Sequence, residues 1–367
     1  MTRPIEGVGT NVAAFVGLAE DGPFETPETF DGWGTDEDEL FDRLRARSQG
    51  RALRSFFDNG GATAVAIQVE DAGVRAVRSG LAALDEVDLV NLLVLPAESA
   101  GHEDAREIIA EAVAFCERRR AMLIVDPPPS WTGAEAMAAA LSDGAAAAVG
   151  TASSNAALYA PRLRHAGPAR GDPNGAFPAS GAVAGVIART DAAQGVWTAP
   201  AGQESEVLGA DLEFELEQDD VREFGARGVN ALRTFPGRRP IVWGARTLAA
   251  GSPDAGEWKY VPVRRMALFL EASIERGLAW TVFEPNDEPL WQEVRESVGA
   301  FLHDLFRASA FHGHSAAEAY FVRCGRDTTT QEDLDVGELV VLVGFAPIRP
   351  AEFVVLRIRA FFGGSAE

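Results

Sequence analysis

A cluster of acids in the stretch WTVFEPNDEPLW, residues 280 to 291, is the first candidate for chemistry. The stretch contains three carboxylates between two tryptophans: Glu284, Asp287, Glu288, Trp280 and Trp291. Paired acids can act as general acid and general base when their surroundings push their pKa values apart. An aromatic cleft would supply such surroundings, so an acid–base active site is one interpretation of this stretch.

The same stretch also fits a structural joint between a strand, LAWTVF, and a helix. Pro285 would end the strand, Asp287 would cap the helix and Pro289 suits a first helical turn. Apolar residues then follow at helical spacing: Leu290, Trp291, Val294, Val298, Phe301, Leu302 and Leu305. Acids at a helix N-terminus are stabilised by roughly 0.3 to 1 kcal/mol each. We therefore expect Pro285, Asp287, Pro289 and Trp291 to form a joint, and no catalysis.

Three histidines, His303, His312 and His314, are the next candidates, because histidine is a common metal ligand. Their spacing provides no helical i, i+4 pair with a general base between its members, and no third ligand is evident nearby. Exposed histidines in and around a turn explain the pattern. We expect no metal and no other cofactor.

A Ser–His–Asp triad can assemble from distant positions, so residue counts do not exclude it. The stretch FPASGAVAG around Ser180 does not match the G-x-S-x-G motif, and we interpret Ser180 as a small helix-packing residue. NGGATAV and GDPNGAF lack the patterns of phosphate-binding loops. We expect no catalytic residue, and an α/β hydrolase-like enzyme with an unrecognised triad is the alternative.

Composition limits the class of protein. A chain of 367 residues exceeds what one hydrophobic core supports, which predicts two or three domains. The net charge of -22 argues against nucleic-acid binding, which needs a basic surface. No apolar run approaches the roughly 18 residues of a membrane-spanning helix, and MTRPIEGVGT lacks the apolar core of a signal peptide. We expect cytoplasmic synthesis, no membrane insertion and no direct nucleic-acid partner.

Two cysteines, Cys116 and Cys324, are too few for a disulfide framework and lack metal-ligand spacing. Cys116 lies in a helical pattern and Cys324 in a strand pattern. Both are expected to be buried thiols.

Strands and helices alternate from about residue 62 to 190. ATAVAIQV, DLVNLLVLP and AMLIVD have the near-continuous apolar character of buried strands, and helices are predicted near 73 to 84, over EDAREIIAEAVAFCERRR and at 176 to 189. This alternation predicts a parallel sheet covered on both faces, an α/β layer domain. The acidic stretch from Val196 to Asp220 is interpreted as an irregular crossing segment.

From residue 228 onward the pattern changes. GVNALRTFPGRRPIVWGART predicts two strands joined by a turn, and VRRMALFLEASIERG predicts a helix. AYFVRC, ELVVLVGFAP and AEFVVLRIR follow as strands. The last alternates between two sets of side chains: Val354, Leu356 and Ile358 against Val355, Arg357 and Arg359. That period of two is typical of a strand with one wetter face.

Apolar strand candidates lie at both ends of the chain. NVAAFVGLA, residues 11 to 19, stands apart from other strands and is followed by a loop-like acidic stretch. An apolar terminal segment is expected to dock into a sheet, either in its own chain or in a neighbouring one.

Three long stretches of the C-terminal third carry a resemblance: GVNALRTFPGRRPIVWGARTL, EWKYVPVRRMALFLEASIERGLAWTVFEPNDEPLWQEVRESVGAFLHDLF and AYFVRCGRDTTTQEDLDVGELVVLVGFAPIRPAEFVVLRI. They resemble the C-terminal domain of the contractile tail sheath family of phage tails, pyocin-like particles and extracellular contractile injection systems. RPIEGVGTNVAAFVGLAEDGP resembles the N-terminal arm of that family. The middle of the chain resembles the family only in layout, and AAGSPDAG is longer than its usual join.

The resemblance implies a fold of mixed α/β and α+β class. It implies an N-terminal arm over residues 1–23, an outer α/β domain over 24–227 and an inner C-terminal α+β domain over 228–367. In this family, terminal strands of each subunit complete sheets in neighbouring subunits. The residues carried over to that linkage are Val12, Ala14, Phe15, Val16 and Leu18 in the arm, and Phe353, Val354, Val355, Leu356 and Ile358 at the other end.

The implied function is mechanical. Such subunits assemble in the cytoplasm as a helical homopolymer around an inner tube, with baseplate and cap or terminator proteins as further partners. They then contract to drive the tube through a target envelope, as part of a virion or a phage-tail-like injection particle. One of two helical stretches, 264 to 276 or 289 to 308, is implied to face the tube. A non-contractile tube or baseplate component is a third hypothesis, which fits poorly because tube proteins are much smaller.

Overall fold

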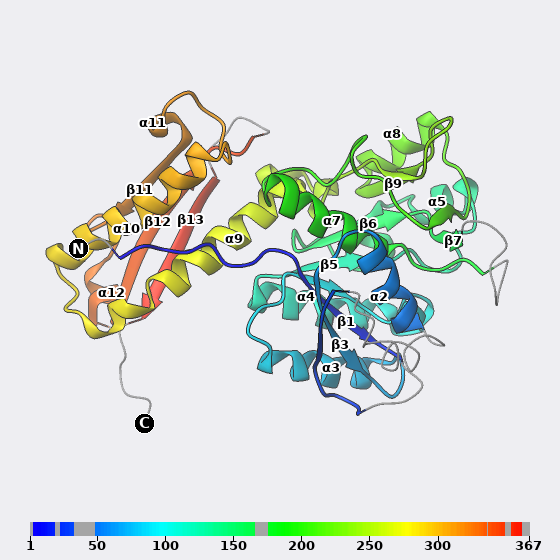
Figure 1. The fold of residues 1–367 in the computed structure, drawn as a ribbon, viewed down its shortest axis with the longest axis horizontal. Helices are drawn as coiled ribbons and strands as arrows, with labels where there is room; N and C mark the ends of the chain where they lie inside the picture. Colours follow the sequence, from blue (N-terminus) through cyan, green and yellow to red (C-terminus); the bar gives the residue numbers. More distant parts are fainter. Residues whose placement is uncertain are drawn as a thin grey trace. The chain divides into compact units, whose positions relative to one another are not determined.

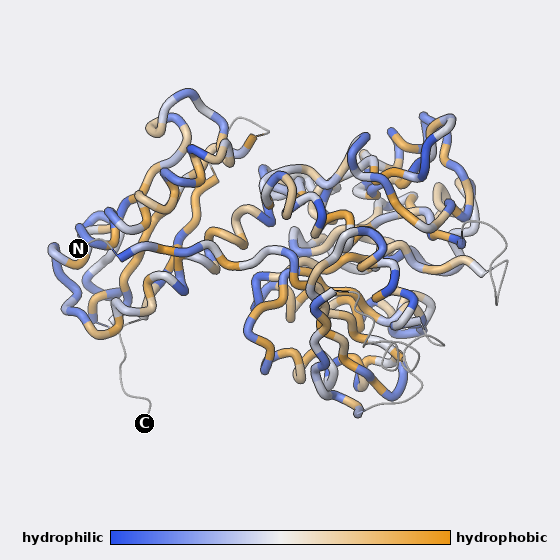
Figure 2. Tube along the Cα trace, viewed as in Figure 1, coloured by the Kyte–Doolittle hydropathy of each residue, from blue (hydrophilic) through white to orange (hydrophobic). Residues whose placement is uncertain are grey.

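The computed structural model describes residues 3–18, 23–32, 48–165, 175–335, 337–348 and 354–361. The chain forms two compact units. The first, here called the α/β unit, contains Gly9–Arg264, and the second, the C-terminal unit, contains Met1–Val8 together with Arg265–Glu367. Figure 1 shows the elements of each unit, and Figure 2 shows that strands of both units are largely apolar.

The α/β unit is built on an eight-stranded sheet with the order β10-β9-β6-β5-β4-β1-β3-β2. Its strands are β1 (Val12–Gly17), β2 (Glu28–Asp31), β3 (Thr63–Gln68), β4 (Leu92–Val94), β5 (Met122–Val125), β6 (Ala156–Ala160), β9 (Val229–Arg233) and β10 (Ile241–Val242). The six inner strands are parallel, and the edge strands β2 and β10 are antiparallel to their neighbours. The predicted parallel sheet is confirmed.

Helices cover both faces of this sheet, each over its own apolar core. Its helices are α2 (Ser48–Asp58), α3 (Val74–Ala83), α4 (Ala105–Arg119), α5 (Ala134–Ala140), α6 (Ala145–Val149), α7 (Ser180–Gln194) and α8 (Gln218–Ala226). α3 and α4 belong to one core, and α2 and α7 to the other (Figure 1). The predictions near 73–84 and over 103–120 are confirmed as α3 and α4, whereas α7 runs five residues beyond the predicted 189.

The stretch expected to be irregular contains two short elements. β8 (Ala210–Leu212) pairs antiparallel with β7 (Leu163–His165) in a small separate sheet, and α8 follows. A capping box stabilises the start of α8, because Glu217 accepts from the backbone of Asp220 and Asp220 accepts from the backbone of Glu217.

Strand β1 lies inside the sheet of its own chain. Val12 pairs with Thr63 of β3, and Ala13 pairs with Leu92 of β4. Its side chains alternate between the two cores, and Phe15 is 1% exposed. This placement corrects the expectation that Val12 to Leu18 is donated to a neighbouring subunit, because both edges of β1 are already hydrogen-bonded and both of its faces are covered.

The boundary between the units also differs from the expected one at residues 227 and 228. β9 pairs with β6, so the segment after residue 228 continues the large sheet. The units divide between Arg264 and Arg265, inside helix α9 (Val261–Gly277). Residues 9 to 23, expected in the arm, likewise fall within the α/β unit.

The C-terminal unit contains a three-stranded antiparallel sheet with the order β11-β12-β13. Its elements after α9 are η5 (Ala279–Phe283), α10 (Glu288–Arg307), α11 (Ala316–Ala319), β11 (Tyr320–Cys324), α12 (Gln331–Asp335), β12 (Glu338–Phe345) and β13 (Val354–Phe361). The three predicted strands are confirmed. The strand predicted for LAWTVF is wrong, because Ala279–Phe283 forms a turn of 3₁₀ helix.

Candidate assembly surfaces

The N-terminal segment, residues 3 to 8, is held on the helices of the C-terminal unit. The Arg3 guanidinium lies 4.1 Å from the centre of the Trp280 ring. The same group lies 3.3 Å from a carboxylate oxygen of Glu284 and 3.8 Å from one of Glu293. These exposed ion pairs contribute little stability, so they serve mainly to position the segment.

Two glycines allow this segment to approach closely. A Cβ atom on Gly277 would lie 2.7 Å from the side chain of Ile5, which is buried. A Cβ atom on Gly7 would lie 2.9 Å from the ring of Phe269. The Val8 amide donates to the Ser273 hydroxyl over 3.1 Å. The surface beneath this segment is therefore matched to it in shape. The sequence patterns did not predict this contact.

The edges of the C-terminal sheet are the second surface. β12 is paired on both sides, whereas β11 and β13 each pair with β12 alone among the described residues. On β13, Val354, Leu356 and Ile358 are buried and Val355 is 52% exposed. An unpaired edge can accept a strand from another chain. Phe353, expected in the linkage, lies outside the described residues.

The three acids of the opening stretch each have a structural partner. Glu284 contacts Arg3, and Glu288 accepts from Arg295 over 2.9 Å. Asp287 Oδ1 accepts from the Leu290 amide over 3.3 Å, which caps α10 as predicted. The acids are thus engaged in separate contacts, an arrangement that fits the predicted joint.

The rest of the joint is also visible. Pro285 precedes the cap, and Pro289 lies in the first turn of α10. Trp291 is buried, and its indole N–H donates to Asn286 Oδ1 over 2.7 Å. Asn286 in turn donates to the carbonyl of Glu338 over 3.2 Å, which ties the start of α10 to β12. Since LAWTVF is helical, the joint connects η5, and not a strand, to α10.

The histidines and cysteines show no reactive arrangement. His303 hydrogen-bonds the Tyr320 hydroxyl over 3.2 Å, and His312 and His314 are exposed. Within the part of the chain that the structure describes, no group of three potential ligands could hold a metal ion. Both cysteines are buried, and burial raises the pKa of the Cys324 thiol to about 12. Such thiols are poor nucleophiles.

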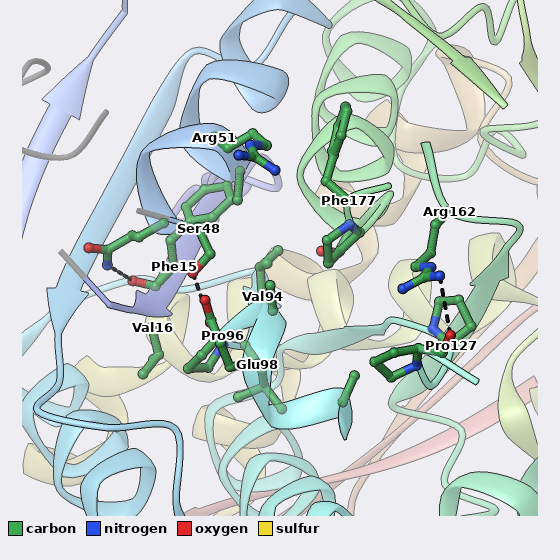
Figure 3. A pocket seen from close by; sticks show the side chains of 18 of the residues that line it. Phe15, Val16, Ser48, Arg51, Val94, Pro96, Glu98, Pro127, Arg162 and Phe177 are labelled. Carbon is green, nitrogen blue, oxygen red and sulfur yellow. Dashed lines mark hydrogen bonds between the residues drawn. The ribbon is translucent and has the colours of Figure 1, made fainter. Parts of the chain in front are cut away.

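A cavity of about 350 Å³ lies at the carboxyl ends of β1 and β4. The chain passes from β1 to β3 on one side and then to β4 on the other, so this is the topological switch point of the sheet. Figure 3 shows Phe15, Val94 and Phe177 around the cavity, with Arg51 and Arg162 on opposite sides of it. The location is one at which many α/β proteins bind ligands.

The polar groups beside this cavity are largely hydrogen-bonded to other groups of the protein. Ser48 donates to Glu98 over 2.8 Å, and Arg162 forms two hydrogen bonds with Glu213. The Ser180 amide donates to Asp126 Oδ1 over 3.0 Å at the start of α7. Burial raises the pKa of the Asp126 carboxyl to about 6, against the lowering effect of its hydrogen bonds with Ser180.

This arrangement does not form a triad. Across the described ranges, no histidine ring hydrogen-bonds a serine hydroxyl. Ser180 is buried within α7, as expected for a helix-packing residue. Sequence reasoning missed Asp126, although its position directly after the apolar strand AMLIV was a usable signal.

Comparison with known proteins identifies the family. The phage tail sheath protein central domain matches residues 66–248, and the phage tail sheath C-terminal domain matches residues 254–361. The anti-feeding prophage helical sheath in its contracted state is 30% identical, with 97% of this chain and 94% of that chain covered and a TM-score of 0.77. The chain belongs to the contractile tail sheath family.

Two further relatives agree. The sheath of an extracellular contractile injection system, PVC, in its contracted state is 28% identical over 96% of this chain and 92% of that chain, with a TM-score of 0.75. The tail sheath protein of Vibrio phage KVP40 is 23% identical over 191 residues, which are 52% of this chain and 27% of the relative. The chain matches 27% and 44% of the lengths of the curated relatives.

No described helix is long and apolar enough to cross a membrane.

Proposed function

We propose that this protein is the sheath subunit of a contractile phage-tail-like injection particle. It polymerises as a helical array around an inner tube, with baseplate and cap proteins at the ends, and its contraction drives the tube through an envelope. The observation that carries the proposal is the likeness, over 97% of the chain, to a helical sheath in its contracted state. Assembly in the cytoplasm is part of the same proposal.

The C-terminal unit forms the inner layer and the linkage in this proposal. β13 presents Val354, Val355, Leu356 and Ile358 beside an edge that no described strand occupies. A neighbouring subunit adds a strand there through main-chain hydrogen bonds, and the alternating side chains set its register. A head-to-tail contact of this kind generates a helical filament when its rotation does not close into a ring.

The N-terminal segment, and not β1, acts as the arm. Residues 3 to 8 pack on α9, η5 and α10 mainly through a few side chains, so the segment can exchange between copies. β1 is unsuited to exchange, because removing it would expose two cores. Work would come from the difference in free energy between two packings of the same subunits, with the linkages intact.

The test is electron microscopy of the purified full chain and of a variant lacking residues 1–8. The full chain should form ribbed tubes or rings, and the shortened chain should remain a folded monomer by circular dichroism and sedimentation. Deletion of residues 1–19 is not a valid test, because it removes β1 and unfolds the α/β unit. A full chain that stays monomeric at all concentrations would contradict the proposal.

A further inference from the structure

The open face of the C-terminal sheet has an unusual composition. Residues that pair directly across strands point to the same face. Arg323 pairs with Leu342, which pairs with Arg357, and the adjacent row is Phe321, Gly344 and Val355. We call Phe321, Arg323, Leu342, Val355 and Arg357 the arginine face.

This face is shaped by packing between its own residues. The Phe321 ring lies across Gly344, where a Cβ atom would come within 2.1 Å of it. The Arg323 guanidinium lies 5.3 Å from the centre of the same ring. Within the described ranges Arg323 pairs with no carboxylate, and Arg357 has only a 3.8 Å contact with Asp333. Two cations therefore flank an apolar strip that is partly exposed.

The opposite face of the sheet buries Val341, Val343 and Leu356 in the core of the unit. An open sheet face in water is normally polar, whereas aromatic, aliphatic and arginine side chains together are typical of protein interfaces. On a chain of net charge -22, two arginines at one surface are also contrary to the overall charge. The composition indicates a surface that is covered by an acidic partner.

An acidic surface lies on the α/β unit. Residues 211 to 220, here called the acidic run, are DLEFELEQDD and contain six carboxylates in ten positions. Asp211 and Glu215 are exposed and, among the described residues, have no cationic partner. The run is held in place by pairing of β8 and by the capping box of α8. It is a rigid acidic surface carried by every copy of the chain.

We propose that the arginine face of one copy docks on the acidic run of a second copy. The inference rests on the proposed function, because the polymer brings neighbouring copies to the C-terminal sheet. It adds a contact through the face of the sheet to the linkage through its edge. The two charge patterns are complementary, and the apolar strip between the arginines excludes water from the contact.

The first experiment compares two double variants of the full chain with equal changes in charge. The first, Arg323→Glu with Arg357→Glu, reverses the charge of the arginine face and is here called the face variant. Arg75→Glu with Arg239→Glu is the control, because both arginines are exposed and lie outside the face. Loss of an interfacial arginine typically weakens binding by about tenfold or more, so the face variant should assemble only at about tenfold or higher concentration. The control should assemble like the unmodified chain.

The second experiment identifies the partner surface. Adding Asp211→Arg with Glu215→Arg to the face variant should restore assembly, because the two charge patterns are then exchanged. Independently, a chain with Val355→Cys and Glu215→Cys should form disulfide-linked chains of copies on mild oxidation. Val355 is exposed, so this variant is expected to fold even if the charge reversal does not. The native cysteines are buried and should not compete.

The outcomes separate the inference from the function on which it rests. A folded face variant that assembles like the unmodified chain overturns the inference and leaves the sheath function standing. Loss of assembly without rescue and without cross-linking overturns the acidic run as the partner and assigns the face to another component, such as the tube. If the unmodified chain never assembles, both proposals fail.

Discussion

The two sheets of this protein differ in how completely their own chain covers them. The eight-stranded sheet has helices on both faces, and its inner strand β1 is paired on both edges. The three-stranded sheet buries one face, and in the described residues β11 and β13 pair only with β12. A sheet with both faces covered by its own chain needs no partner to bury its core. A sheet with an uncovered face and unpaired edges provides groups to which another chain can bind.

The strongest way to break this comparison is Phe15→Ala. Phe15 is 1% exposed on β1, and its ring meets that of Phe56 edge-on at 5.4 Å. Truncating a buried phenylalanine typically costs about 3 to 5 kcal/mol in the free energy of unfolding. Denaturant unfolding at low protein concentration measures this cost. A cost below about 1 kcal/mol, with loss of assembly, would restore the idea that this strand is donated to a neighbour.

The two faces of β13 give a second prediction within one strand. Leu356 is buried at 4% exposure, so Leu356→Ala should lower the free energy of unfolding by about 2 to 4 kcal/mol. Val355→Ala, at the exposed neighbouring position, should change it by less than about 0.5 kcal/mol. Equal effects in denaturant unfolding would show that the chain covers both faces, against the comparison.

The third prediction concerns Asp126, whose pKa burial raises to about 6. The folded chain then binds a proton more tightly than the unfolded chain, in which an aspartate has a pKa near 3.9. Stability should therefore fall as pH rises from about 4 to 6 and stay lower above that range. Asp126→Asn should remove this slope and stabilise the protein by roughly 1 to 3 kcal/mol at pH 7.5. Unfolding curves with the same slope in both proteins would contradict this assignment.

The smallest expected effect is that of Asp287→Ala. Loss of the cap on α10 should cost about 1 kcal/mol in the free energy of unfolding. Glu296→Ala, an exposed position on the same helix, is the control and should cost only a few tenths, since its contact is one hydrogen bond with Gln292. If the Asp287 variant showed a biochemical defect that this loss of stability does not explain, the acid-pair interpretation would be supported instead.

Local patterns predicted many of the elements and much of the joint. Helical spacing and a typical cap residue placed α10, and alternation placed β13. LAWTVF was assigned wrongly because its residues have high strand propensity, which tertiary context overrode here. The packing of the N-terminal segment on the C-terminal unit could not be predicted, because the residues in contact are more than 260 positions apart in the sequence.

The sequence by itself determined which segments are apolar, where the capped helix α10 begins, and that the chain resembles tail sheath proteins over long co-linear stretches. Only the tertiary structure decided where β1 is paired and where one unit ends. The physical reason is that periodicity shows which side of an element is buried but not which partner buries it. Val12 pairs with Thr63, and the Asn91 amide donates to the Val12 carbonyl; both partners lie far along the chain, and such backbone pairing leaves little trace in residue type.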